Sequence, residues 1–180
     1  MTEPGTRVWD LPVRLVHWAL AVSCAAGWVT TAYLTGWHEA AGYAALALVV
    51  FRVFWGFAGG RYARFSQFMR GPRATLSYAR LVWQGHAPRY LGHNPLGAWM
   101  AMALWSCVAA LGVTGWLYTT DMFFGEPWLN LTHELLAWAL FPLVALHVAG
   151  VVHTVSQKSD RLITAMFTGD KRPPSGGDVS

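Results

Sequence analysis

Long apolar stretches alternate with polar segments along this chain, and this pattern predicts its main elements. Four stretches carry almost no charge, and about 20 helical residues are enough to cross the hydrocarbon core of a membrane. Lipid cannot hydrogen-bond to irregular backbone, so such stretches must be helical. The predicted helices run over about 15–34, 40–57, 97–118 and 131–155. They predict an all-α fold, an integral membrane four-helix bundle, as one domain over residues 1–170.

The polar segments predict two further features. After the second stretch, Pro72 can open a helix and Gly85 can end it. Apolar residues recur between them at helical spacing, with Arg73 and Arg80 on another face, so an amphipathic helix over about 72–84 is predicted on the cytoplasmic membrane surface. Residues 171–180 are polar and rich in Pro and Gly, and they are expected to form a disordered tail.

Composition agrees with a membrane environment. The chain is 54% hydrophobic and 12% charged, whereas a soluble domain usually carries about twice that charged fraction. Its 11 Trp residues suit membrane interfaces. The two cysteines, Cys24 and Cys107, lie in apolar stretches without a C-x-x-C motif, which excludes a covalently attached c-type haem.

The charges predict the orientation of the helices. All 13 Lys and Arg residues lie toward one side: they precede the first stretch, follow the fourth or lie in the long segment between the second and third, and Arg52 lies near the end of the second stretch. The other two connections and their borders carry only Glu39, Asp121, Glu126 and Glu134. By the positive-inside rule, both termini and the long segment are cytoplasmic. The high pI of about 9.4 then reflects orientation signals and lipid contacts, and no nucleic acid partner is expected.

Four of the seven histidines form a pattern that indicates a cofactor. His17 lies at the cytoplasmic mouth of the first helix, and His38 and His133 lie at the outer mouths of the second and fourth. His147 follows His133 by 14 residues, close to four turns, so the two share a helix face about 21 Å apart. An outer pair, His38 with His133, and an inner pair, His17 with His147, could each hold a haem iron inside the bundle.

The remaining histidines have simpler interpretations. His153 is turned about 120° from His147 and is expected to be interfacial. His86 lies in the basic segment and is expected to be solvated. For His93 two readings stay open: a polar turn residue, or a group that bonds a haem propionate or assists proton transfer.

Other residues could complete the haem sites. Gly42 and Gly150 each follow a candidate ligand by about one turn and would leave room for a porphyrin. Arg52 follows His38 by 14 residues and could pair with a propionate of the inner haem, or it could extend to the lipid headgroups. Arg14, one turn before His17, is a further propionate candidate.

Several motifs carry a family resemblance. The sequences R-L-V-H-W at His17, H-E-A-A-G-Y at His38, and H-E-L-L-A and A-L-H-V-A-G from His133 to His147 resemble bacterial cytochrome b561 and the b-type cytochrome subunits of nickel-iron hydrogenases. The resemblance runs from Val8 to about Gly169. It implies a four-helix bundle in the bacterial inner membrane with two non-covalent haems b, and it implies His17, His38, His133 and His147 as their ligands.

The resemblance also implies electron transfer between the quinone pool and a redox partner protein. An acidic outer surface favours a basic partner such as a c-type cytochrome, and a dehydrogenase subunit is the other candidate. The chain is shorter than hydrogenase-type subunits, which favours either a free-standing protein or a partner other than hydrogenase. A homodimer is left open. We expect an electron carrier rather than a stand-alone enzyme, since two axial histidines saturate the iron.

Three alternatives stay open at this point. The protein could be a free-standing oxidoreductase of the superoxide:quinone type. It could be a transporter that uses histidines for protons, although two pairs at two depths would then be unnecessary. A metal-dependent hydrolase would need H-E-x-x-H, but Gly42 and Ala137 stand where the second His would be after His38 and His133.

Overall fold

The structure is a computed structural model that describes residues 5–31, 35–158 and 161–179. Contacts divide the chain into two compact units. The first unit comprises Met1–Arg14, Trp55–Met102 and Leu146–Ser180, and the second comprises Leu15–Phe54 and Ala103–Ala145.

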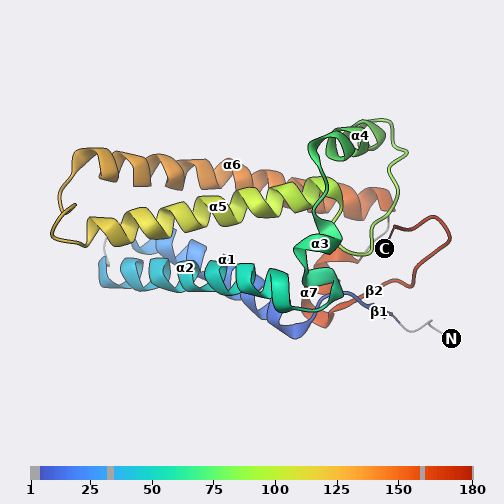
Figure 1. Cartoon of the computed structure of the whole chain (residues 1–180), viewed down its shortest axis with the longest axis horizontal. Helices are drawn as coiled ribbons and strands as arrows, with labels where there is room; N and C mark the ends of the chain where they lie inside the picture. The colour runs from blue at the N-terminus through green and yellow to red at the C-terminus, as the bar shows by residue number, and fades with distance from the viewer. Residues whose placement is uncertain (1–4, 32–34, 159–160, 180) are drawn as a thin grey trace. The chain divides into compact units, whose positions relative to one another are not determined.

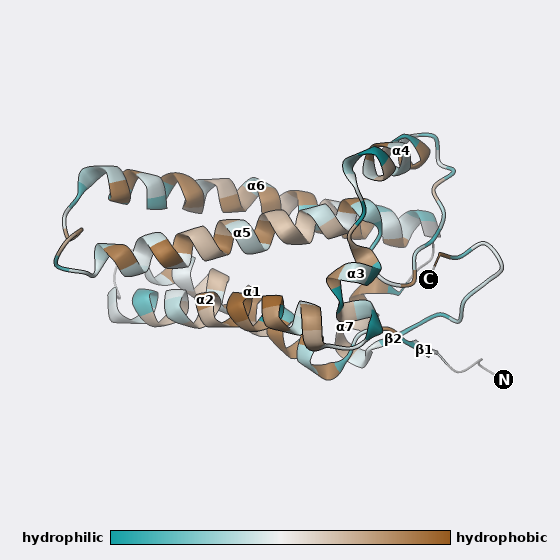
Figure 2. Cartoon of the chain, in the orientation of Figure 1, coloured by the Kyte–Doolittle hydropathy of each residue, from teal (hydrophilic) through white to brown (hydrophobic). Residues whose placement is uncertain are grey.

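Four long helices dominate the chain (Figure 1). They are α1 (Leu11–Thr30), α2 (Thr35–Ala58), α5 (Pro95–Tyr118) and α6 (Pro127–Lys158). All four are long and apolar enough to cross a membrane, which confirms the prediction of four membrane-spanning helices. Figure 2 shows hydrophobic residues along their length, and large apolar side chains such as Val22 (66% exposed) and Leu135 (60%) face outward, as lipid-facing residues do.

These helices begin a few residues earlier than predicted because capping residues precede the apolar stretches. Asp10 Oδ1 accepts a hydrogen bond from the backbone N–H of Val13 at 2.9 Å, which is an N-cap for α1. Asn94 Oδ1 accepts one from Gly97 N–H at 2.7 Å at the start of α5. Both α5 and α6 begin with Pro, whose missing N–H is harmless in a first turn. Residues 32–34, predicted to end the first helix, lie outside the described residues.

The second unit is built from the segments of these four helices that lie in it. Its core consists of Ala45 and Val49 of α2, Cys107 and Val108 of α5, and Leu140 of α6, with Leu20 and Cys24 of α1 packed against them. Small residues allow close packing, as is common in membrane bundles. A Cβ atom at Gly112 would lie 2.8 Å from Leu46 Cβ, so α2 and α5 approach closely there.

The first unit contains the short elements. Strand β1 (Thr6–Arg7) pairs antiparallel with β2 (Asp170–Lys171), and helix α7 (Leu162–Thr168) precedes β2. Gly169 joins α7 to β2 at φ +91°, and its carbonyl accepts hydrogen bonds from the N–H groups of Val8 and Trp9 at 2.9 and 3.0 Å. The small core of this unit gathers Val8, Trp9, Val13, Ala63 and Ala165. The all-α prediction missed this strand pair, because two-residue strands have no periodicity to detect.

The segment between α2 and α5 holds three short helices, η1 (Arg61–Ala63), α3 (Phe65–Phe68) and α4 (Pro72–Trp83). Helix α4 occupies the stretch predicted to be amphipathic, and Gly85 follows it at φ +73°. Figure 2 shows both hydrophobic and hydrophilic residues on α4, and Trp83 is 93% exposed. Tyr78 points inward against Tyr90, and burial together with this second phenol raises the pKa of Tyr78 to about 12.

In the structure, the segment predicted to be a disordered tail contacts the segment that follows α4. Asp178 Oδ2 accepts hydrogen bonds from Arg89 at 2.6 Å and from Ser175 N–H at 2.8 Å, and both charged side chains are buried. Val179 N–H donates to the Arg89 carbonyl, and Leu91 N–H donates to the Val179 carbonyl. A single buried ion pair can order a polar segment whose composition alone indicates disorder.

We predict that Asp178→Asn releases this segment. Burial would raise the pKa of the Asp178 carboxyl, but the Ser175 N–H and the Arg89 guanidinium outweigh it and hold the pKa below its ordinary value of 3.8. The contribution of the Asp178 carboxylate to stability is therefore present above pH 3.8, and it is lost as the pH falls through the lowered pKa. Removing the negative charge that pairs with the buried Arg89 should cost about 1–3 kcal/mol, and trypsin should cleave after Lys171 about tenfold faster.

The matched control is Asp170→Asn, which removes an exposed ion pair with Arg7. Exposed pairs contribute little, so cleavage should barely change. Equal cleavage of the Asp178 variant and the wild type would show that the ion pair does not hold the segment. Pepsin, which is active in acid, can follow the wild type through the pH range where Asp178 becomes protonated.

Candidate functional site

A cavity of about 420 Å³ lies among the four helical segments of the second unit. Small residues form much of its lining: Gly27, Ala41, Gly42, Ala45 and Gly112. A Cβ atom at Gly42 would meet nothing within 4 Å, so this glycine opens onto free space. A cavity walled by small residues between bundle helices suits a flat ligand.

His38 and His133, predicted as the outer pair, both line this cavity. Their ring centroids are 6.1 Å apart, with the ring planes inclined by 69°. A bond from a transition metal to an imidazole nitrogen is about 2 Å long, and the nitrogen lies about 1 Å from its ring centroid, so two imidazoles that share one metal ion have centroids about 6 Å apart. The separation of this pair matches that value.

Hydrogen bonds determine which nitrogen of each ring can bind a metal. His38 Nδ1 lies 2.8 Å from the Gly27 carbonyl oxygen and must donate to it. Thr114 Oγ1 lies 2.8 Å from the Ala110 carbonyl and donates its one proton to the backbone, so it accepts from His133 Nδ1 at 2.9 Å. Both rings then carry their proton on Nδ1 and a lone pair on Nε2. This is the form in which histidine ligates a metal, and the residues present fit a bis-histidine haem.

Aromatic side chains form part of the cavity wall. Trp28 and Trp138 both line it, with ring centroids 5.3 Å apart, and Phe141 lies 4.3 Å from Trp28. A Cβ atom at Gly115 would lie 3.3 Å from His133 Cε1, so this glycine makes room for the ring. Sequence reasoning missed the roles of Thr114 and the Gly27 carbonyl, since no spacing rule connects either residue to a histidine on another helix.

Arg52 is buried in the second unit, with 3% of its surface exposed. Its guanidinium carbon lies 4.6 Å from the centroid of the Trp105 ring, a cation–π contact between α2 and α5. A side chain held on a neighbouring helix in this way is directed into the second unit. The contact favours an interior role for the Arg52 charge.

The predicted inner pair is divided between the two units. His17, half-buried beside Trp18 at 5.2 Å, belongs to the second unit, and the half-buried His147 belongs to the first. Their pairing stays a prediction. Arg14 donates a hydrogen bond to the Phe167 carbonyl near the end of α7. Gly150 is exposed on α6.

The other histidines lie elsewhere. His93 lies against the rings of Trp9 and Phe68, with centroids 4.8 and 4.9 Å away, and His86 and His153 are exposed. Over residues 5–31, 35–158 and 161–179, no group of three or more His, Cys, Asp or Glu side chains is placed to hold a metal ion. These residues therefore contain no three-ligand site of the hydrolase type.

The chain is similar to known proteins over almost its whole length. The family described as "Prokaryotic cytochrome b561" matches residues 8–169. Relatives include proteins named "Probable Ni/Fe-hydrogenase B-type cytochrome subunit". That of Azotobacter vinelandii is 28% identical (95% of this chain, 92% of the relative), and that of Azotobacter chroococcum mcd 1 is 29% identical (95% and 92%). That of Bradyrhizobium diazoefficiens is 22% identical (94% and 87%). No solved structure matches.

Two glycines of the cavity should respond differently to an added methyl group. Gly112→Ala should destabilise the protein by about 1–3 kcal/mol, because its Cβ would lie 2.8 Å from Leu46 Cβ. In the haem-free protein, Gly42→Ala should be tolerated, since its Cβ would meet no atom within 4 Å. Thermal unfolding in detergent measures both variants. A lower midpoint for Gly42→Ala than for Gly112→Ala would contradict the described packing.

Proposed function

Because the chain belongs to the prokaryotic cytochrome b561 family, we propose that it carries electrons across the bacterial inner membrane through two bis-histidine haems b. The family and the four apolar helices support the general conclusion that this is a multi-pass membrane protein that transfers electrons by way of haem b. The observation that best supports bis-histidine ligation is the geometry of His38 and His133. Their ring centroids are 6.1 Å apart, and both Nε2 atoms are available to bind a metal.

Haem b supplies a one-electron couple when it is bound. In this proposal His38 and His133 hold the outer haem, and His17 and His147 hold the inner one. With two histidine ligands to each iron, no position would remain for a substrate, and a bound haem would supply outer-sphere electron transfer. An electron carrier is therefore favoured over a stand-alone enzyme.

The surrounding residues orient the ligands of the outer site and line its cavity. The Gly27 carbonyl and the Thr114 hydroxyl hold the two imidazoles in the ligating tautomer. The Trp28 and Trp138 rings form an apolar part of the cavity wall. Gly42 leaves space for the edge of a porphyrin. For the inner haem, Gly150 is the candidate to leave space for the porphyrin, and Arg14 is a candidate to pair with a propionate.

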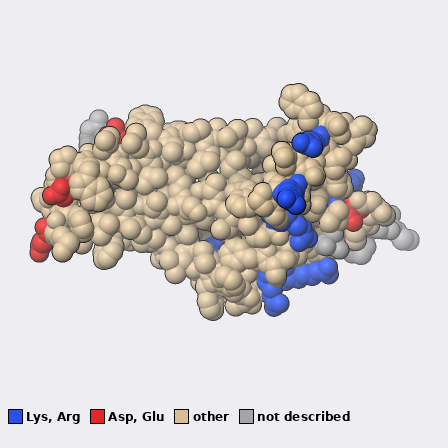
Figure 3. All heavy atoms as spheres, turned by 45° about the horizontal axis from the view of Figure 1, so that its top comes forward, with Lys and Arg blue, Asp and Glu red and all other residues tan. Residues whose placement is uncertain are grey.

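Charge supports a choice of partner. Glu39, Asp121, Glu126 and Glu134 are all exposed on the second unit, and Figure 3 shows acidic side chains at the end where α5 leads into α6. In the proposed orientation this surface lies outside the cytoplasmic membrane, and both termini lie in the cytoplasm. A basic partner such as a c-type cytochrome would be attracted to it. The same charge would repel superoxide, an anion, and this disfavours the superoxide:quinone alternative.

The relatives suggest the second partner class, a dehydrogenase subunit, because they are named as hydrogenase cytochrome subunits. Their alignments extend over 224 and 228 positions, more than the 180 residues of this chain, so they carry segments that this chain lacks. That difference favours a partner other than hydrogenase. The second electron carrier in this proposal is quinone, which is soluble in the membrane. It would exchange electrons with the haems at the cytoplasmic or the outer side.

We expect two extractable haems b per chain, measured by pyridine haemochrome analysis. His38→Ala or His133→Ala should remove one haem, and His17→Ala or His147→Ala should remove the other, because each haem loses an axial ligand. His153→Ala is the matched control on α6 and should retain both haems. A single haem in the wild type would disprove the two-pair proposal. If His153→Ala lost a haem and His147→Ala retained both, the haem ligand on α6 would be His153 and not His147.

Arg52 should raise the potential of the inner haem. The positive charge of a buried guanidinium favours the reduced, less positive iron. A charge about 10 Å away at an effective dielectric constant of about 20 contributes between about 1 and 2 kcal/mol. Arg52→Gln should then lower one midpoint by about 60 mV and leave the other nearly unchanged in a redox titration.

The control for this prediction is Arg73→Gln, which removes an exposed positive charge on α4. It should move neither midpoint, since solvent screens an exposed charge. If both midpoints of the Arg52 variant equal those of the wild type, Arg52 serves the packing of α2 on Trp105 and not the haem.

A further inference from the structure

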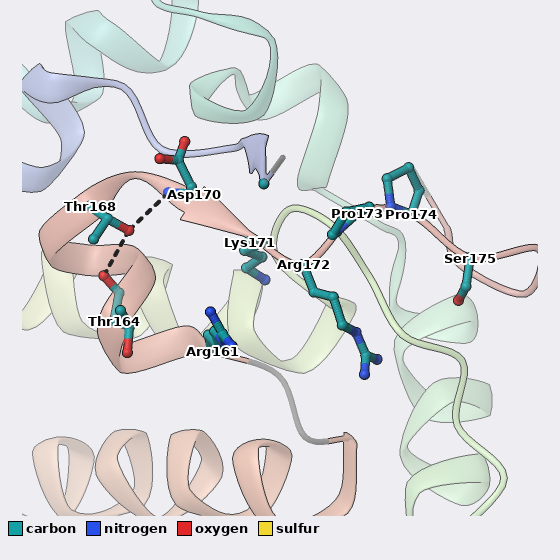
Figure 4. Close-up of a pocket in the computed structure, with 10 residues that line it drawn as sticks. Arg161, Thr164, Thr168, Asp170, Lys171, Arg172, Pro173, Pro174 and Ser175 are labelled. Atoms are coloured by element: carbon teal, nitrogen blue, oxygen red, sulfur yellow. Dashed lines mark hydrogen bonds between the residues drawn. The ribbon is translucent and has the colours of Figure 1, made fainter. Parts of the chain in front are cut away.

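Two surfaces of the first unit take no part in the proposed haem sites. One is a cavity of about 690 Å³, formed mainly by α7, β2 and the segment after β2 (Figure 4). Several of its polar groups have partners inside the protein: Thr168 Oγ1 donates to the Thr164 carbonyl at 3.1 Å and accepts from Asp170 N–H at 3.2 Å, and Asp170 pairs with Arg7. The other surface is the outward side of α4, where large apolar side chains are exposed.

Two apolar side chains of α4 are directed away from the protein. Leu76 has 57% of its surface exposed and Trp83 has 93%, whereas Leu81 has 37%. Seven residues, close to two turns, separate Leu76 from Trp83, so these two form one stripe along the helix. Tyr78 lies on the opposite side of α4 and is buried against Tyr90. The inward side of α4 is therefore occupied, whereas the described residues leave a bulky apolar stripe exposed.

Positive charge runs along α4 beside this apolar stripe. Arg73 and Arg80 are also seven residues apart, and both are exposed. They lie about 60° and 40° around the helix axis from Leu76, and the exposed polar residues Ser77 and Gln84 lie further round. The order around the helix is thus apolar, cationic, then neutral polar. The same order is met on passing from the hydrocarbon of a membrane through its phosphates to water, and long Arg side chains reach such phosphates readily.

Helix α4 is attached close to the end of a membrane helix. Helix α5 has 24 residues and is about 36 Å long, whereas the hydrocarbon core is about 30 Å thick, so its end turns lie among the headgroups. The exposed Trp99 lies in the second turn of α5, a position that suits an interfacial tryptophan. Its indole N–H donates to the Arg70 carbonyl at 3.1 Å, and α4 begins two residues later at Pro72. The start of α4 is therefore held near the boundary of the membrane.

We propose that the outward side of α4 inserts into the lipid headgroup layer at the cytoplasmic membrane surface. Leu76 and Trp83 contact the acyl chains, and the two arginines lie among the lipid phosphates. The sequence predicts an amphipathic helix, and the structure selects the apolar side chains that meet lipid, because Tyr78 is turned inward. A protein could also cover an exposed tryptophan, but the attachment of α4 beside the first turns of α5 favours lipid. This insertion depends on the membrane helices and not on the haems.

The test is photocrosslinking of the haem-loaded, full-length protein in phospholipid vesicles. The photoreactive amino acid p-benzoylphenylalanine replaces one residue at a time: Leu76 or Trp83 in the apolar stripe, and Ser77 or Gln84 as matched controls. Each control is exposed and adjacent to its test position, but it is turned by about 100° around the helix. The vesicles contain phosphatidylglycerol and phosphatidylcholine with radiolabelled acyl chains, so lipid adducts can be counted. The haem absorption spectrum checks that each protein is intact.

Positions 76 and 83 should each capture at least about fivefold more lipid than positions 77 and 84, because only the apolar stripe reaches the acyl chains. Equal capture at all four positions, or more capture at the controls, would overturn the proposal. The same proteins are also irradiated in membranes of the cells that produce them. A protein adduct in place of the lipid adduct at positions 76 and 83 would identify a protein as the occupant and overturn the lipid assignment. The haem count tests the proposed function separately, since lipid capture is measured without reference to it.

Discussion

Hydrocarbon offers no hydrogen-bonding partner, and the arrangement of the candidate site depends on this constraint. Each imidazole of the outer pair has one ring nitrogen engaged inside the protein, His38 with the Gly27 carbonyl and His133 with the Thr114 hydroxyl. These bonds determine the tautomer, and the tautomer leaves a lone pair on each remaining nitrogen. The same bonds connect α2 to α1 and α6 to α5, so one polar requirement both orients the ligands and ties the helices of the second unit in pairs.

The small residues have a matching role in packing. Where α2 and α5 approach at Gly112, a side chain would collide with Leu46, whereas Gly42 on the same cavity faces open space. Glycine is thus used in two ways in the second unit: to bring helices together, and to keep a space free between them. The cation–π contact of Arg52 with Trp105 allows a positive charge to remain inside the helices without exposure to lipid.

Charge serves orientation and recognition at the same time. The Lys and Arg residues predict the orientation of the helices, and the acidic residues of the second unit form a surface suited to a basic partner. In the first unit, two carboxylates accept hydrogen bonds from other groups of the protein. Asp10 caps α1 and accepts a hydrogen bond from the Trp55 indole at 3.0 Å, and Asp178 holds the segment after β2 through Arg89.

By itself the sequence determined the four apolar helices, the family and the candidate histidines, because apolar length, helical spacing and short motifs are local properties of the chain. Helix starts were misplaced because Asp10 and Asn94 cap outside the apolar stretches. Only the tertiary structure brought His38 to within 6.1 Å of His133 and revealed Thr114 and Gly27 as their partners. It also showed Asp178, near the C-terminus, in a buried ion pair with Arg89. Contacts between residues far apart in the chain depend on packing, and no local pattern encodes them.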